Sequence, residues 1–276
     1  MVVQHNLQAA NTNRQLGITT SAQAKSTEKL SSGYKINRAA DDAAGLSISE
    51  KMRSQIRGLN KASSNAQDGV SLVQTAEGAL NETHSILQRM NELATQAANG
   101  TNTTVDRSAI KAEIDQLASE INRIQSTTQF NTMNLLDGSF SGDANKMKLQ
   151  VGALSGQKID FSIANMSVTA LGLTAANLSV ASFDAAGKTM KAVQDAIEKV
   201  SKQRSAMGAI QNRLEHTIAN LDTTSENPQS AESRIRDTDM ASEMVKYSNN
   251  NILAQAGQAM LAQANQSNQG VLSLLG

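Results

Sequence analysis

A heptad repeat in the second half of the chain constrains the fold more than any other feature. Between residues 190 and 221, positions separated by alternating steps of three and four are apolar at eight of ten places. The ten positions are Met190, Val193, Ile197, Val200, Arg204, Met207, Gln211, Leu214, Ile218 and Leu221. A 3.5-residue repeat of this length predicts a long helix with a narrow apolar seam that packs against other helices, as in a coiled coil or slender bundle.

Two earlier segments offer partner seams. The first is short and regular, and consists of Ile110, Ile114, Leu117, Ile121 and Ile124. The second extends from Leu46 to Ala97, but Gly58, Gly69 and Gly78 interrupt it, and each costs about 1 kcal/mol relative to alanine in a helix. A continuous helix there requires compensation by packing. We expect long helices at about 44–98, 104–127 and 187–222.

Composition agrees with a thin, mainly helical molecule. The 276 residues include one proline, four phenylalanines, two tyrosines and no tryptophan, so helix breakers are scarce and a broad aromatic core is not expected. Between residues 128 and 185, short alternating runs separated by turn residues predict a small β-hairpin region. Residues 223–229, which contain Pro228, predict a break after the third helix. The expected fold is mainly α: a long-helix hairpin or coiled-coil bundle with a small β-hairpin region.

Charge and cysteine content exclude several classes of protein. Lys+Arg 25 and Asp+Glu 25 give a formal net charge of +0, so no basic excess favours nucleic acid or an anionic membrane. The chain contains no cysteine, which excludes disulfides and thiolate metal sites. It also has no run of about 20 apolar residues, and the pattern of its first residues predicts no ordinary secretory signal. We expect no nucleic-acid partner and no membrane insertion.

Candidate catalytic or metal-binding groups do not form a recognised motif. The three histidines, His5, His84 and His216, are far apart in the sequence. The nearest approach to paired carboxylates is at Asp41, Asp42, Asp237 and Asp239, where helix capping or ion pairs with Arg234 and Arg236 are favoured over acid–base or metal chemistry. The glycines form no phosphate-binding loop. We therefore expect no enzyme activity, no metal site and no cofactor.

Both ends of the chain avoid charge. Residues 249–276 contain no Asp, Glu, Lys, Arg or His, and the first 24 residues contain only Arg14 and His5 as ionisable side chains. In the C-terminal segment, apolar residues alternate with amides in a helical pattern. Two interpretations remain open: an amide-rich disordered tail, or terminal helices buried in an assembly, where uncharged side chains avoid the cost of desolvating ions.

Several motifs resemble one known family. They are LSSGYKINRAADDAAGLSISEKMRSQIRGL at 30–59, DGVSLVQTAEGAL at 68–80, LQRMNELATQAANGT at 87–101, QNRLEHTIANL at 211–221, AESRIRDTDMASEM at 231–244 and NNILAQAGQAMLAQANQSNQGVLSLL at 250–275. Nearly the whole of both ends resembles bacterial flagellin, whereas residues 140–185 are less diagnostic. The sequences of these motifs are most similar to those of flagellins from Gram-positive gut anaerobes. The chain resembles a short form of the family that lacks the outer domains.

The resemblance implies a domain organisation and a function. Residues 1–43 and 233–276 would form the inner D0 domain of paired terminal helices, and residues 44–232 the D1 rod. The chain would polymerise with copies of itself into the extracellular flagellar filament used for motility, after type III export in an unfolded state. In the family the terminal segments order on polymerisation, which unites the two interpretations of the uncharged tail. Implied partners are the flagellar cap, hook-associated proteins and an export chaperone that binds the C-terminal segment.

The resemblance also implies specific contact residues. In flagellins that the host Toll-like receptor 5 recognises, an arginine, a leucine and a glutamate form the main contact, and the matching residues here are Arg89, Leu93 and Glu113. The alternative is that Arg89 and Glu113 are solvated helix residues and that Leu93 belongs to the filament contact. The polymerisation seam implied for the terminal helices comprises Leu7, Leu16, Ile252, Leu253, Ala256, Met260, Leu261, Leu272 and Leu275.

Two other functions are kept as alternatives. A hook–filament junction protein shares terminal helices with flagellin but is present in few copies. A filament-displayed enzyme would carry its catalytic group in the central segment, but residues 128–185 contain no histidine and no nucleophile–base pair.

Overall fold

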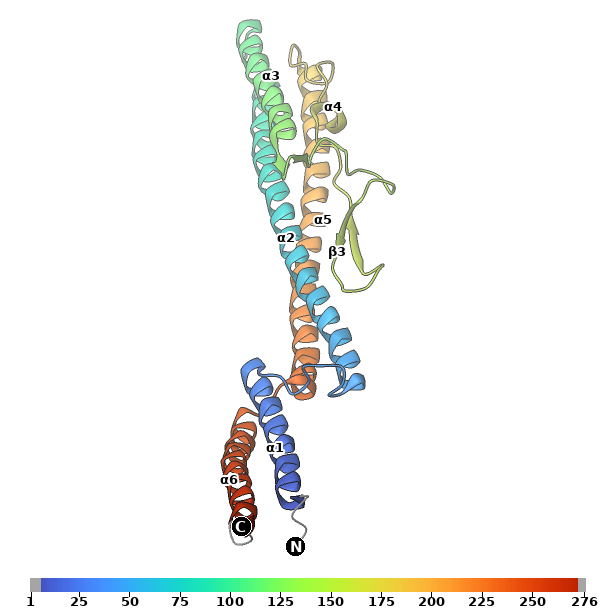
Figure 1. Cartoon of the computed structure of the whole chain (residues 1–276). Helices are drawn as coiled ribbons and strands as arrows, with labels where there is room; N and C mark the ends of the chain where they lie inside the picture. Colours follow the sequence, from blue (N-terminus) through green and yellow to red (C-terminus); the bar gives the residue numbers. More distant parts are fainter. Residues whose placement is uncertain (1–5, 273–276) are drawn as a thin grey trace. The chain divides into compact units, whose positions relative to one another are not determined.

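The computed structural model describes the backbone of residues 6–272 and the side chains of residues 6–267. Its main helices are α1 (Leu7–Ser32), α2 (Ala43–Ala97), α3 (Thr104–Thr127), α5 (Phe183–Arg236) and α6 (Met240–Leu272) (Figure 1). The chain separates into two compact units, one of residues 1–55 with 226–276 and one of residues 56–225. The predicted D0 and D1 boundaries stay a prediction.

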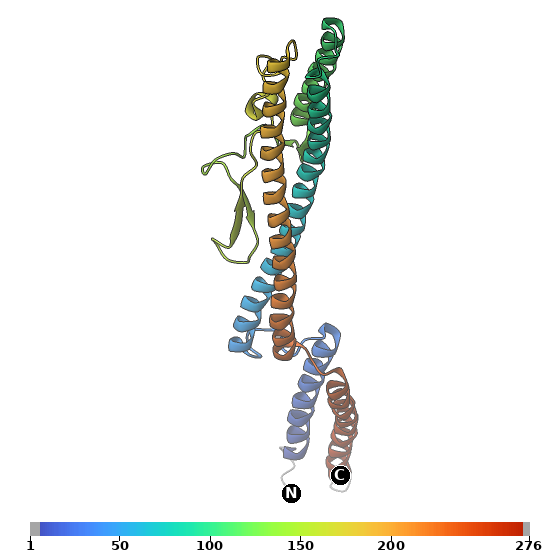
Figure 2. The ribbon, with the colours of Figure 1, turned by 180° about the vertical axis from the view of Figure 1, so that it is seen from behind.

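The region from 128 to 185 contains short strands, as expected, and one short helix. Strands β1 (Gln129–Phe130) and β2 (Met133–Asn134) pair antiparallel, as do β3 (Met147–Gln150) and β4 (Lys158–Phe161), and α4 spans Val168–Leu171. In the unit of residues 56–225, the long helices α2, α3 and α5 run alongside one another in opposite views (Figures 1 and 2). The mainly α fold class is confirmed.

The heptad seam of α5 is confirmed, and the two alternating series of residues that form it differ in burial. Every seventh residue from Val193 is buried: Val193, Val200, Met207, Leu214 and Leu221. The intervening series, Met190, Ile197, Arg204, Gln211 and Ile218, is half-buried. The two polar members, Arg204 and Gln211, therefore occupy the edge of the seam, where their long side chains reach solvent.

The glycines of α2 make room for the β3–β4 hairpin. A Cβ atom on Gly69 would overlap Leu149 Cδ1, and one on Gly58 would lie 2.8 Å from the Cβ of Ala153. The hairpin thus rests against the helix where two side chains are missing, and Ile159 packs there with Ala66 and Leu214. This contact supplies the packing that a continuous α2 requires. Gly78 has no neighbouring atom within 4 Å of its Cβ position and plays no such role.

The break predicted at residues 223–229 is wrong, because α5 continues through Pro228 to Arg236. Proline removes one helical hydrogen bond and costs about 3 kcal/mol, but contacts on both sides hold the helix. Ser225 Oγ donates to Asn60 Oδ1 over 2.7 Å in one unit. In the other, Arg236 pairs with Glu50 at 3.2 Å. Tertiary contacts therefore override the local signal.

Candidate assembly surface

Helices α1 and α6 form a closely packed antiparallel pair in the unit of residues 1–55 and 226–276. The seam between them contains small residues, since Ser26, Ala254 and Ala264 are buried. A Cβ atom on Gly257 would lie only 3.8 Å from Leu16 Cβ. The amide of Asn6, whose Oδ1 caps α1, donates to the carbonyl of Ala264 over 3.1 Å. Small side chains let the two backbones approach without an apolar core between them.

One charged group lies inside this seam. Glu243 is the only charged residue that is buried in the part of the chain whose side chains are described. Its carboxylate accepts a hydrogen bond of 2.7 Å from Ser26 Oγ and pairs with Lys246 Nζ at 3.1 Å. The Ser26 hydrogen bond lowers the pKa of Glu243; burial opposes this shift, and Lys246 and Lys29 reinforce it. The charge is thus held by a donor from α1.

Most of the large apolar side chains that were predicted for the polymerisation seam are exposed in this pair. Leu7 is 77% exposed, Ile252 64% and Met260 59%, and Leu253 and Ala256 are also exposed. The other described members of the predicted polymerisation seam, Leu16 and Leu261, are half-buried. The Leu272 side chain and Leu275 lie outside the described residues. Most of the described seam therefore points outward, as an unsatisfied contact surface would.

The sequence pattern missed further apolar residues on this surface. They are Ile18, Met240, Met244 and Val245, all exposed. The sequence could have indicated them only through a contrast in size. Each is a large apolar residue in a helix whose inner positions carry alanine, glycine, serine or leucine. A groove of about 450 Å³ adjoins the same surface between α1 and α6. Its lining includes Leu16, Leu253, Gly257 and Met260.

The residues matched to receptor recognition do not share one environment. Arg89 on α2 and Glu113 on α3 are half exposed, at 51% and 47%, and form an ion pair of 3.0 Å. Arg89 also pairs with Glu92 at 3.2 Å. Leu93 is only 2% exposed and belongs to the main hydrophobic core. The apolar area expected of Leu93 is therefore not on the surface, because this position lies on the α2 face that carries Met90 and Ala97.

The acidic residues near the helix starts act as caps. Asp42 Oδ1 accepts from the Gly45 N–H over 2.9 Å, and Asp239 Oδ1 accepts from the Ala241 N–H over 3.0 Å. Arg236 pairs with Glu50, not with a neighbouring aspartate. Within the described residues, no three His, Cys, Asp or Glu side chains gather as a metal site. Over residues 6–272, no helix has the length and apolarity needed to cross a membrane.

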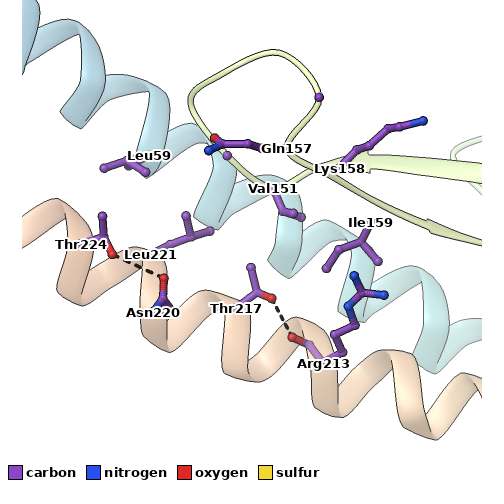
Figure 3. Close-up of a pocket in the computed structure, with 12 residues that line it drawn as sticks. Leu59, Val151, Gln157, Lys158, Ile159, Arg213, Thr217, Asn220, Leu221 and Thr224 are labelled. Atoms are coloured by element: carbon purple, nitrogen blue, oxygen red, sulfur yellow. Dashed lines mark hydrogen bonds between the residues drawn. The ribbon is translucent and has the colours of Figure 1, made fainter.

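A second groove, of about 380 Å³, lies where the hairpin loop passes α2 and α5 (Figure 3). Leu59, Val151, Ile159 and Leu221 form its apolar part. The Thr217 hydroxyl donates to the Arg213 carbonyl over 2.8 Å, so it is engaged by its own helix (Figure 3). The residues that line this groove include no histidine, aspartate, glutamate or serine.

Comparison with known families decides the classification. Residues 3–141 match the bacterial flagellin N-terminal helical region, and residues 190–275 match the bacterial flagellin C-terminal helical region. The chain belongs to the bacterial flagellin family. It is 54% identical to a flagellin of Halalkalibacterium halodurans and 51% identical to one of Bacillus subtilis, and each alignment covers 100% of both chains. The resemblance to short flagellins of Gram-positive bacteria is thereby confirmed; the narrower placement among gut anaerobes stays a prediction.

Other relatives bear on the kind of flagellar protein. A flagellar filament 31.3 kDa core protein of Treponema maltophilum is 50% identical over 100% of both chains. A crystal structure of Bacillus cereus flagellin is 32% identical, with a TM-score of 0.50, and the match covers 57% of this chain and 88% of that one. A protein described as hook-associated, from Vibrio parahaemolyticus, has a TM-score of 0.61 at 16% identity, covering 71% of this chain and 100% of that one. This last likeness shows a shared fold and does not distinguish flagellin from a junction protein.

Proposed function

We propose that this flagellin is a structural subunit that polymerises into the flagellar filament through the outer surface of α1 and α6. The observation that carries the proposal is the distribution of apolar side chains on this helix pair, which differs from that of an ordinary surface helix pair because large apolar residues are exposed. Small residues and one buried carboxylate fill the seam within the chain, whereas Leu7, Ile252 and Met260 are exposed. Full-length identity of about half to a flagellar filament core protein supports the same role.

The physical reason for assembly is the apolar surface left uncovered on the pair. Burying one large apolar side chain contributes about 1.5 to 3 kcal/mol, so several of them in one interface offset the entropy lost when two chains associate. The C-terminal part of α6 carries no ionisable group from Asn249 onward, so its burial desolvates no charge.

Electron microscopy of the purified full chain at high concentration tests the proposal, and regular tubes are expected. The double substitution Ile252→Gln with Met260→Gln should abolish them, because both residues are more than half exposed and their replacement removes apolar surface from α6. Val105→Gln with Phe183→Gln is the matched control, since both residues are exposed apolar side chains in the other unit. Normal filaments from the α6 double variant would contradict the assigned surface.

The proposed role extends to location and partners. The filament would lie outside the cell, after type III export, and would contact the flagellar cap and hook-associated proteins. An export chaperone would cover the exposed apolar residues of the C-terminal segment before assembly. A pull-down with full-length chain and with chain lacking residues 249–276 tests the chaperone: only the full chain should retain it.

The alternatives make different predictions. A hook–filament junction protein would be present in few copies and would form no long self-polymer, so thousands of copies in sheared filaments exclude it. The role as a structural protein implies no catalysis. Stoichiometric metal or peptidase activity in purified filaments would contradict that part of the proposal.

Recognition by host Toll-like receptor 5 is proposed as a second property of the unit of residues 56–225. Arg89 and Glu113 support it, because they join two helices on an exposed face. Arg89→Ala should weaken binding of unassembled chain by at least about tenfold, as expected for an interface arginine. Arg123→Ala is the matched control, because Arg123 makes a similar exposed ion pair with Glu120 on α3.

Leu93 requires a different interpretation in this proposal. Since its side chain is buried, it would act by holding α2 against α3 beneath the contact rather than by touching the receptor. Leu93→Ala should therefore lower the unfolding midpoint together with receptor binding, whereas Arg89→Ala should lower binding alone. Unchanged binding in both variants would refute the site.

A further inference from the structure

The connections between the long helices and the terminal pair meet around one arginine. Arg236 is the last residue of α5, and three residues separate it from the first residue of α6. The N–H of Lys35 donates to the Arg236 carbonyl over 2.6 Å, and the N–H of Thr238 donates to the Gly33 carbonyl over 2.9 Å. These two bonds form a short antiparallel bridge between Tyr34 and Asp237.

The side chain of Arg236 adds two contacts to this bridge. Its guanidinium carbon lies 4.5 Å from the centroid of the Tyr34 ring, and Nη1 is 3.2 Å from Glu50 Oε1. The side chain is only 13% exposed, and its Nε is buried without an acceptor among the described residues. A cation placed over a ring and shielded from water interacts more strongly than an exposed one, so the ring and Glu50 stabilise a group that is otherwise incompletely satisfied. We call the bridge with Arg236, Tyr34 and Glu50 the clasp.

Apolar packing in the seam beyond the clasp does little to fix the register, which leaves the clasp and the contact of Ser26 with Glu243 to specify it. Leu16 faces Gly257, and a slip of one heptad would place it opposite Ala264 or Asn250 instead. Alanine differs from glycine by one methyl group, so the apolar packing of Leu16 does not by itself block the slip toward Ala264. Large apolar side chains normally specify the register of paired helices, and several of those on this pair, including Leu7 and Ile252, are exposed.

We propose that the clasp sets the register in which α1 and α6 pair, with Arg236 as the positioning residue. The bridge places Tyr34, which follows the end of α1, opposite Asp237, which precedes the start of α6. It therefore fixes the alignment of the two helices at one end of the pair. The contacts Ser26 with Glu243 and Asn6 with Ala264 lie further along the pair and follow in the same antiparallel register. Pairing is a property of a single chain; only its consequence for assembly rests on the proposed filament function.

Disulfide trapping in the full-length chain tests this proposal directly, because the natural sequence contains no cysteine. The pair Leu16→Cys with Gly257→Cys reports the native register, since the Cβ···Cβ distance of 3.8 Å is ideal for a disulfide. Leu16→Cys with Ala264→Cys, and Leu16→Cys with Asn250→Cys, report slips of one heptad. Seven residues along a helix span about 10 Å, which prevents these pairs from bridging in the native register.

The clasp variants are then compared in each cysteine background. Arg236→Gln should lower the yield of the native disulfide about fivefold and raise that of a shifted pair, because it removes the cation from both the ring and Glu50. Arg234→Gln is the matched control: the same change, two residues away, in an exposed side chain. Tyr34→Phe keeps the ring and should leave the yields unchanged.

Two results would overturn the proposal: equal native yields in the Arg236→Gln and Arg234→Gln chains, or equal yields in Tyr34→Leu and Tyr34→Phe chains. The tyrosine pair decides the question if Arg236→Gln proves too unstable by circular dichroism. Electron microscopy of the same chains separates the two proposals. Native-register disulfides without filaments contradict the filament function alone, and filaments with a register insensitive to Arg236 contradict the clasp alone.

Discussion

At the scale of single residues, the glycines of α2 show how one residue type serves different purposes in one helix. Gly58 lies beneath Ala153 of the hairpin loop, with the backbone Cα of Ala153 3.2 Å from its Cβ position. Gly78 has nothing within 4 Å. The first glycine is required for close approach, and the second only weakens the helix.

Alanine substitutions should therefore have opposite effects at these two positions. Gly78→Ala should raise the free energy of unfolding by up to about 1 kcal/mol, because alanine restricts the unfolded chain and favours helix. Gly58→Ala should lower it by about 1 to 3 kcal/mol, because the added methyl group displaces backbone. Urea unfolding followed by circular dichroism measures both, and a change of the same sign in the two variants would refute the packing role.

The buried Glu243 leads to a prediction about pH. Its pKa is lower in the folded pair than in the unfolded chain, so its stabilising contribution is present above the unfolded pKa, near 4.3. The contribution is lost as the pH falls through the lower folded value. Ser26→Ala removes the main cause of this shift and should destabilise the pair at pH 7 by about 1 kcal/mol.

The difference between wild type and Ser26→Ala should shrink below about pH 4 as Glu243 becomes protonated. Hydrogen exchange in α1 and α6, corrected for the intrinsic effect of pH, measures it. Ser31→Ala, at an exposed position near the end of α1, is the control. A difference that grows on acidification would contradict the role assigned to the charged form.

At the scale of elements, α5 shows a local signal overridden by distant contacts. The helix passes through Pro228 although this residue cannot donate to the carbonyl four residues earlier. The heptad positions before it pack into the unit of residues 56–225, and Arg236 anchors its end in the other unit. Composition predicts a break here because proline and polar residues cluster at 223–229, and a local pattern contains no information about these distant contacts.

Pro228→Ala should stabilise this part of α5 by about 1 to 3 kcal/mol, since the Thr224 carbonyl regains a helical donor. Hydrogen exchange should slow between residues 224 and 232. Gln229→Ala, which restores no hydrogen bond, should change exchange there much less. Faster exchange in the Pro228→Ala chain would indicate that the proline is required for the geometry of the helix.

At the scale of the whole molecule, the two units obtain stability from different sources. The unit of residues 56–225 contains the main core, which includes Leu80, Met90, Ile114 and Val193. The α1–α6 pair buries mostly small residues and leaves its large apolar side chains exposed. We therefore expect the larger unit to fold from its own chain, and the terminal pair to gain stability when neighbouring copies cover its exposed apolar side chains.

Deleting residues 249–276 should therefore separate folding from assembly. The shortened chain should keep the cooperative thermal unfolding of the larger unit, with a midpoint within a few degrees of that of the full chain, and should form no filaments. Calorimetry and electron microscopy of the same preparation measure the two properties. Loss of the main transition would show that the larger unit depends on the terminal pair.

Much of this protein was determined by its sequence alone. Apolar periodicity placed α2 and α3 within about a residue of their ends, because a helix that buries one face must repeat with its own period. The motifs at both ends identified the family. The scarcity of charged residues near both termini indicated that parts of α1 and α6 are suited to burial in an assembly.

Only the tertiary structure decided which face of each helix is covered. Leu93 is buried and Ile252 is exposed, although each is a large apolar residue in a helix with an apolar pattern. The glycines beneath the hairpin and the clasp around Arg236 also join segments that are far apart in sequence. Periodicity reports which residues share a face, since it is a local property. What covers that face depends on contacts between distant segments, which no local pattern records.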